Sequence, residues 1–154
     1  MTIVSQILQN KGNQVWSVTP ETTIYETLEL MAEKNVGAVL VLEEGHIAGI
    51  FSERDYARKV SLQGKSSRDT SIADVMTSPV ISVRPGLSID KCMRLMTDRK
   101  FRHLPVVAND QLVGIISIGD VVNAIINEQG IIINHLEDYI TGKIYEIPPI
   151  VADN

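Results

Sequence analysis

Residues 15–57 read VWSVTPETTIYETLELMAEKNVGAVLVLEEGHIAGIFSERDYA, and residues 80–122 repeat the pattern as VISVRPGLSIDKCMRLMTDRKFRHLPVVANDQLVGIISIGDVV. The two stretches align without a gap at an offset of 65 residues, and 12 of the 43 aligned positions are identical. A duplicated unit tends to pack on its copy, because neither unit buries its apolar surface alone. We therefore expect two similar halves related by pseudo-two-fold symmetry, with grooves between them.

Each copy carries the pattern of an α/β unit. In the first copy, a short apolar run predicts a strand at residues 15–18, and apolar residues at helical spacing predict a helix from Ile24. Two apolar runs around a polar turn predict a hairpin at residues 38–51, and a second helix follows from Ser52. The second copy repeats all four features. The predicted fold class is α/β, with tandem β-α-β-β-α repeats whose small mixed sheets pack against helices.

The order of the repeats along the chain predicts its domains. We expect a first repeat with an N-terminal segment and a polar linker at residues 1–67, and a second repeat with an extended C-terminal helix at residues 68–141. Residues 142–154 carry two prolines and are expected to form an extended tail. The isoleucines that follow Val122 have no counterpart in the first repeat, which indicates a contact between subunits.

The composition excludes several classes of function. The single cysteine, Cys92, rules out an internal disulfide and is expected to be buried and unreactive, and the three scattered histidines lack the spacing of metal ligands. A net charge of −5 disfavours binding to nucleic acid or to anionic membranes, because both need a basic surface. No signal sequence and no apolar run of about 18 residues are evident, so we expect a cytoplasmic protein.

The sharpest local signal is a serine followed three residues later by an aspartate, directly after a strand. It occurs as Ser52 and Asp55 in one copy and as Ser117 and Asp120 in the other. One interpretation is a variant of the capping box, in which each side chain satisfies a backbone amide at the start of a helix. A second, compatible interpretation is a ligand site, in which the helix start faces a phosphate and the carboxylate accepts hydrogen bonds from two ribose hydroxyls.

Three segments carry a resemblance to a known family. They are the paired G-I-[FI]-S-x-x-D motif at residues 49–55 and 114–120, the run RHLPVV at residues 102–107, and DVMT at residues 74–77. Together they resemble a CBS domain pair, also called a Bateman module, over about residues 3–127. The run SERDYARK from Ser52, with GKSS from Gly64, is similar to stand-alone CBS-pair proteins, including the CBSX type.

The resemblance implies a ligand, a set of binding residues and an assembly. The ligand is an adenine nucleotide, AMP in the first place, with ADP, ATP, NAD and S-adenosylmethionine as alternatives, and no metal is required. The assembly is a homodimer, a disc of four repeats. The matching positions are Ser52, Asp55, Ser117 and Asp120 for the ribose, Ile50 and Ile115 beside adenine, Gly37, Ala38, Arg102 and His103 along the clefts, and Thr77 as a polar contact.

The two copies differ where charge matters, so the two clefts are expected to be unequal. Arg102 and His103 replace the small residues Gly37 and Ala38, and Arg54 aligns with a glycine. We add Arg54 to the binding residues and expect the cleft that contains Asp55 to favour phosphates, because guanidinium pairs strongly with phosphate.

The lead hypothesis is a non-catalytic regulatory module that binds an adenine nucleotide and acts on a separate partner protein. One alternative is a structural dimerisation module with vestigial clefts. Another is a nucleotide-processing enzyme that uses His103 and Asp55, although the sequence shows no activated nucleophile and no catalytic residue is assigned.

Overall fold

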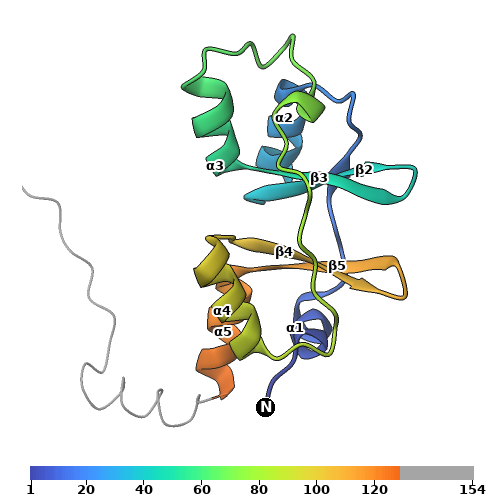
Figure 1. Ribbon diagram of the computed structural model, residues 1–154, viewed down its shortest axis with the longest axis vertical. Helices are drawn as coiled ribbons and strands as arrows, with labels where there is room; N and C mark the ends of the chain where they lie inside the picture. The colour runs from blue at the N-terminus through green and yellow to red at the C-terminus, as the bar shows by residue number, and fades with distance from the viewer. Residues whose placement is uncertain (129–154) are drawn as a thin grey trace, which may run out of the picture.

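The computed structural model describes residues 1–128, which form two stacked lobes, one for each repeat (Figure 1). The first lobe contains β1 (Ser17–Val18), α2 (Ile24–Lys34), β2 (Ala38–Glu43), β3 (His46–Ser52), α3 (Glu53–Asp55) and the π-helical η1 (Tyr56–Ser61). The second lobe contains α4 (Ile89–Arg99), β4 (His103–Ala108), β5 (Gln111–Ser117) and α5 (Ile118–Glu128). The predicted α/β class with tandem repeats is confirmed.

The first long helix of each repeat begins at a capping residue and ends at a residue in the left-handed conformation. Thr23 caps α2 by accepting a hydrogen bond from the backbone nitrogen of Glu26 at 3.1 Å, and Ser88 caps α4 in the same way at the nitrogen of Lys91. Each helix ends at a residue in the left-handed conformation, Asn35 with φ 53° and Lys100 with φ 57°. Equivalent local signals thus produce equivalent helices.

The strands form two small sheets that also mirror each other. β2 and β3 pair antiparallel, as do β4 and β5, and both hairpins have a register shift at equivalent positions, after Val41 and after Val106. β1 runs parallel to β2. In the second repeat the predicted strand at residues 80–83 is reduced to one parallel bridge between Val83 and Val106. The first sheet has three strands and the second has two.

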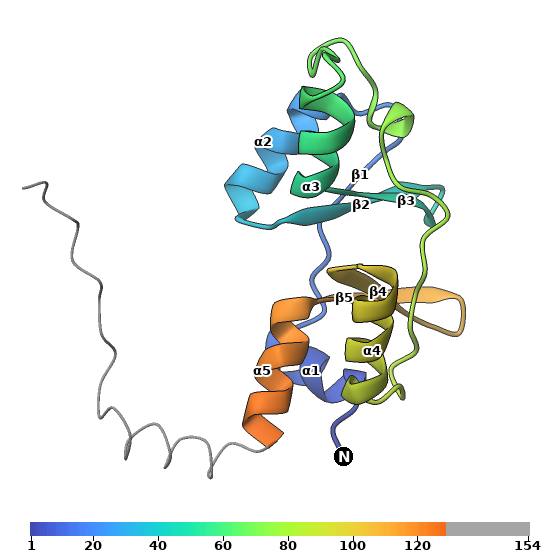
Figure 2. The same ribbon diagram turned by 60° about the vertical axis from the view of Figure 1, so that its left-hand side comes forward.

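Each lobe is completed by a segment that precedes the other repeat in the sequence. Helix α1 (Val4–Lys11) lies beside α5 in the second lobe (Figure 2), and its residues Val4, Ile7 and Leu8 belong to the core of that repeat. The 3-10 turn η2 (Ile72–Asp74) packs Ile72 into the core of the first repeat. The sequence predicts one domain at residues 1–67 that includes the N-terminal segment, whereas α1 of that segment packs against the second repeat. This exchange ties the two lobes together.

Two glycines allow the exchanged segments to approach the sheets. A Cβ on Gly49 would lie 2.4 Å from Sδ of Met76, which follows η2, and a Cβ on Gly114 would lie 2.7 Å from Cδ2 of Leu8 in α1. A larger residue at either position would overlap the Met76 or Leu8 side chain, which would have to shift.

Some sequence predictions concern residues after residue 128. The helical extension from residue 129 to 141 and the tail at residues 142–154 lie outside the described residues. Within residues 1–128, no helix is both long enough and apolar enough to span a bilayer.

Candidate functional site

The serine and aspartate of the repeated motif bond to each other's backbone in both copies. In the first copy, Ser52 Oγ accepts a hydrogen bond from the nitrogen of Asp55 at 3.1 Å, and Asp55 Oδ2 accepts one from the nitrogen of Ser52 at 3.0 Å. Ser117 and Asp120 form the same pair, at 3.1 and 2.8 Å. The capping-box interpretation is therefore confirmed, and each aspartate is held at the junction of a strand and a helix.

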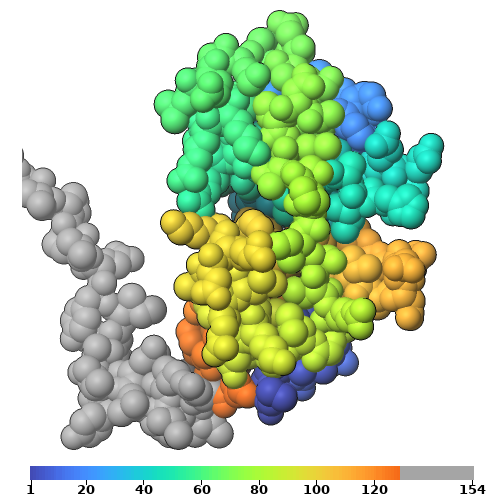
Figure 3. Space-filling model, viewed as in Figure 1, coloured from blue at the N-terminus to red at the C-terminus, as the bar shows by residue number. Residues whose placement is uncertain are grey.

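A cleft of about 790 Å³ lies between the repeats at the first of these junctions, and we call it the Asp55 cleft. Figure 3 shows the hollow between the green part of the first lobe and the yellow part of the second. Its walls are Gly37, Ile50, Ser52–Asp55, Arg58, Lys59 and Thr77 from the first lobe and the linker, and Pro79–Ile81 and Arg99–His103 from the second repeat. Both repeats thus contribute to one cavity of ligand size.

The Asp55 cleft is strongly cationic, although the chain carries a net charge of −5. Six lysines and arginines line it, against two acids, Glu53 and Asp55. The six are Arg54, Arg58, Lys59, Arg99, Lys100 and Arg102. Three come from each lobe, so an anion in the cleft would be attracted from both sides.

Thr77 and Lys59 orient the carboxylate of Asp55. The hydroxyl of Thr77 donates to Asp55 Oδ1 at 3.2 Å and accepts from the Lys59 ammonium at 2.9 Å, while that ammonium lies 3.5 Å from Asp55 Oδ1. Thr77 is itself fixed by two backbone hydrogen bonds with Ile50, of 3.0 and 2.8 Å. The carboxylate is 17% exposed, so it is accessible but constrained.

His103 closes one side of the cleft against Gly37. Its Cε1 and Nε2 atoms each lie 3.8 Å from the point where a Cβ on Gly37 would be, so the missing side chain leaves room for the imidazole. Burial lowers the pKa of His103, and the charges of Lys11 and Arg102 lower it further, against opposing effects of Asp120 and Glu53. The imidazole is therefore neutral at pH 7 and offers a hydrogen bond rather than a charge.

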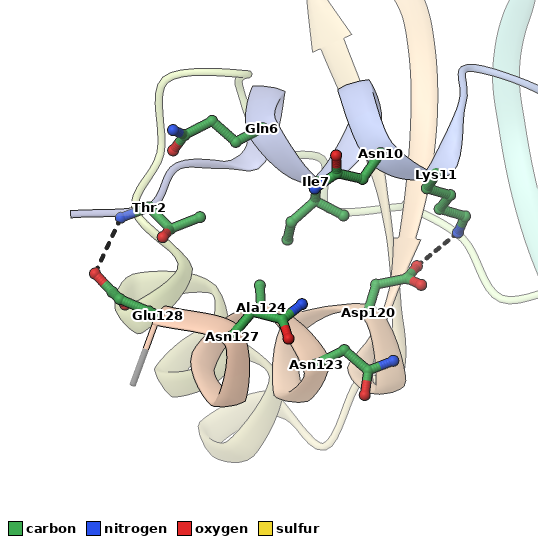
Figure 4. A pocket seen from close by; sticks show the side chains of 10 residues that line it. All are labelled: Thr2, Gln6, Ile7, Asn10, Lys11, Asp120, Asn123, Ala124, Asn127 and Glu128. Carbon is green, nitrogen blue, oxygen red and sulfur yellow. Dashed lines mark hydrogen bonds and ion pairs between the residues drawn. The ribbon is translucent and has the colours of Figure 1, made fainter. Parts of the chain in front are cut away.

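Eight of the twelve residues predicted to bind ligand meet in this cleft: Gly37, Ile50, Ser52, Arg54, Asp55, Thr77, Arg102 and His103. Ala38 does not line it, because its side chain is buried in the sheet and only 7% exposed. Ile115, Ser117 and Asp120 belong to the second junction, and Asp120 lines a separate groove of about 390 Å³ between α1 and α5 (Figure 4).

Sequence reasoning missed several cleft residues. Arg99, Lys100 and Phe101 lie at the end of α4, and Pro79 and Ile81 lie at the start of the second repeat, where no motif marks them. A signal for residues 99–101 was present, because they directly precede Arg102, which was predicted to line a cleft. Among the described residues, no three His, Cys, Asp or Glu side chains gather in a way that could hold a metal ion.

The chain belongs to the CBS domain family, because the model of that family matches residues 4–62 and again residues 72–127. Two such domains in one chain form a CBS domain pair, a regulatory type of module, and the resemblance inferred from the sequence is confirmed. The two repeats described above are thus the two domains of this pair.

Known proteins and structures agree with this assignment. The mitochondrial CBS domain-containing protein CBSX3 of Arabidopsis thaliana is 38% identical over 151 residues, a match that covers 92% of this chain and 73% of the relative. A solved CBS-domain protein from Burkholderia ambifaria is 47% identical with a TM-score of 0.80, covering 83% of this chain and 96% of that one. The CBS domain pair of protein MJ0100, solved with 5′-methylthioadenosine and S-adenosyl-L-methionine, shares the fold at 22% identity and a TM-score of 0.72, covering 83% and 98%.

Proposed function

We propose that this protein is a non-catalytic regulatory module that binds an adenine nucleotide in the Asp55 cleft and acts on a separate partner protein. The observation that carries the proposal is the cleft itself. It places one oriented carboxylate among six cationic side chains contributed by both repeats. A ligand with vicinal hydroxyls at one end and phosphate at the other matches this arrangement.

Each part of a nucleotide has a matching wall. The carboxylate of Asp55 accepts from the ribose hydroxyls, while Ile50 and Ile81 provide apolar surface for the base. Arg54 and Arg102 stand on opposite lobes and bind the phosphates as charge-assisted donors. The adenosine-containing ligands of the MJ0100 pair support an adenine base. AMP is the first candidate, and ADP, ATP and NAD carry additional phosphate for the six cationic side chains to bind.

Titration calorimetry of the full chain with AMP, ATP, NAD and S-adenosylmethionine tests the proposal. Asp55→Asn should weaken binding by about 1.5 to 3 kcal/mol, the range of hydrogen bonds to charged groups, which is about 10- to 150-fold in the dissociation constant. Asp110→Asn is the matched control, because Asp110 lies in the β4–β5 turn at φ 61°, a conformation that asparagine tolerates. Equal affinities for the two variants would contradict the assignment of the site.

Regulation follows from binding between two lobes. A nucleotide that contacts both repeats favours one orientation of the lobes, and it shifts a partner's equilibrium by the difference in its affinity for the two orientations, typically about 1 to 3 kcal/mol. Incubation of the protein with ATP or NAD should leave the nucleotide intact. Product formation that is lost in His103→Gln would instead establish an enzyme.

We further propose that two chains form a homodimer. Val122 and Ile126 lie four residues apart on α5 and remain 39% and 40% exposed, which leaves an apolar stripe on one helix face. Light scattering after gel filtration should give twice the mass of the chain, and Ile126→Glu should give the monomer mass.

A cytoplasmic location stays a prediction, and CBSX3 of Arabidopsis is mitochondrial.

A further inference from the structure

The second junction differs from the first in one contact. Lys11, the last residue of α1, directs its ammonium at Asp120 of the second repeat (Figure 4) and also reaches a strand carbonyl beside it. It donates to Asp120 Oδ2 at 2.6 Å and to the carbonyl oxygen of Ile115 at 2.9 Å. These acceptors are the counterparts of Asp55 and of the Ile50 carbonyl, which belong to the proposed nucleotide site.

In the first repeat, the corresponding acceptors are arranged differently. The Ile50 carbonyl is bonded to the backbone nitrogen of Thr77 at 2.8 Å, as in a sheet. Lys59 donates to the hydroxyl of Thr77 at 2.9 Å and forms a longer ion pair with Asp55 Oδ1 at 3.5 Å, and its side chain is 40% exposed at the edge of the cleft. No cation therefore joins the carboxylate to the strand carbonyl at this junction.

The difference arises from the length of the exchanged segment. Before the second repeat, η2 has three residues, and the chain then extends so that Thr77 pairs with β3. Before the first repeat, α1 has eight residues and ends at Gly12, whose φ of 98° turns the chain away. Helix α1 thus places the Lys11 ammonium at the Ile115 carbonyl, whereas the equivalent Ile50 carbonyl accepts its hydrogen bond from the backbone nitrogen of Thr77.

Electrostatics strengthens the Lys11 contact. The side chains of Lys11 and Asp120 are 33% and 23% exposed, so the pair is only partly screened by water. Burial alone raises the pKa of Asp120, but the hydrogen bonds from Lys11 and Ser117 outweigh this effect and hold the pKa below its ordinary value. The carboxylate is therefore ionised and bound by an ammonium at neutral pH.

We propose that Lys11 is the built-in occupant of the Asp120 junction, so that each chain binds one ribonucleotide, in the Asp55 cleft, instead of two. The inference rests on the proposed function, since it assigns the ligand to one of two related clefts. Ribose hydroxyls at Asp120 would have to displace an ammonium that already bonds both the carboxylate and the Ile115 carbonyl. Lys11 thereby decides which of the two clefts accepts a nucleotide.

The experiment is a calorimetric titration with AMP that measures the number of sites per chain. The wild type should bind one AMP, and Lys11→Met, which keeps the aliphatic chain and removes the charge, should bind two. In the Asp55→Asn background, where binding is weakened, Lys11→Met should restore one site. Lys91→Met in the same background is the matched control and should restore none, because Lys91 is exposed on α4 outside both clefts.

The outcomes separate this inference from the proposed function. If the wild type binds no adenine nucleotide, the proposed function is wrong. If the wild type binds two, the proposed function stands and the role of Lys11 is overturned. The role is also overturned if Lys11→Met, with an unfolding midpoint equal to that of Lys91→Met, gains no site in either background.

Discussion

Replacing Gly49 with alanine should reduce both the stability of the first repeat and its affinity for nucleotide. The new Cβ would lie 2.4 Å from Sδ, 2.7 Å from Cγ and 3.1 Å from Cβ of Met76. Carbon atoms pack at about 3.5 to 4 Å, so the methionine must move by about 1 Å or more. Part of the overlap is relieved by the flexible thioether, but the close approach of the Met76 Cβ requires the backbone to move as well. Overpacking of this kind costs about 1 to 3 kcal/mol.

The displaced residue adjoins the binding site. Met76 precedes Thr77, whose backbone pairs with Ile50 and whose hydroxyl donates to Asp55. A shift of Met76 therefore loosens the group that orients the carboxylate, and AMP affinity should fall together with stability.

Urea unfolding and AMP titration measure the two effects. Gly86→Ala is the control, because a Cβ there would meet no atom within 4 Å, and it should be neutral or slightly stabilising. Gly49→Ala combined with Met76→Ala should cost less than the sum of the single changes, because the smaller side chain removes the overlap. A Gly49→Ala protein as stable as Gly86→Ala, or strict additivity in the double variant, would refute the reasoning.

Three further predictions follow from the charges and burial of single residues. Arg54→Met should weaken ATP binding about tenfold and adenosine binding less than about twofold in calorimetry, because Arg54 acts on phosphate; an equal loss would show a structural role. Burial and Lys11 lower the pKa of His103, so the unfolded chain binds more protons than the folded protein as the pH falls through the usual histidine range. The free energy of unfolding should therefore drop between about pH 8 and about pH 5.5 in urea titrations, and His103→Gln should lose this component; an unchanged slope would contradict it. Burial raises the pKa of the Cys92 thiol to about 11, so the native protein should not react with a thiol reagent at about pH 8 and should react fully in urea; a fast native reaction would show the thiol to be exposed.

The sequence by itself determined the repeated elements of this protein. Helix starts at Thr23 and Ser88, both hairpins and the two capping boxes follow from signals within a few residues, because helix and strand periodicities are local properties of the chain. Eight of the cleft residues could also be named, since the repeated motif marks the junctions of strand and helix where they lie.

Tertiary structure alone decided which segments meet. No local pattern shows that α1 packs against the second repeat, because the contact between Leu8 and Gly114 joins residues more than 100 positions apart and depends on complementary packing. The same packing brings Arg99 and Lys100 to face Arg54 across the cleft. It also carries Lys11 to Asp120, which adds a chemical difference between the two junctions that their own sequences do not contain. The amino-acid sequence determines which residues form each junction, and the exchange of α1 and η2 between the lobes determines which side chains surround them.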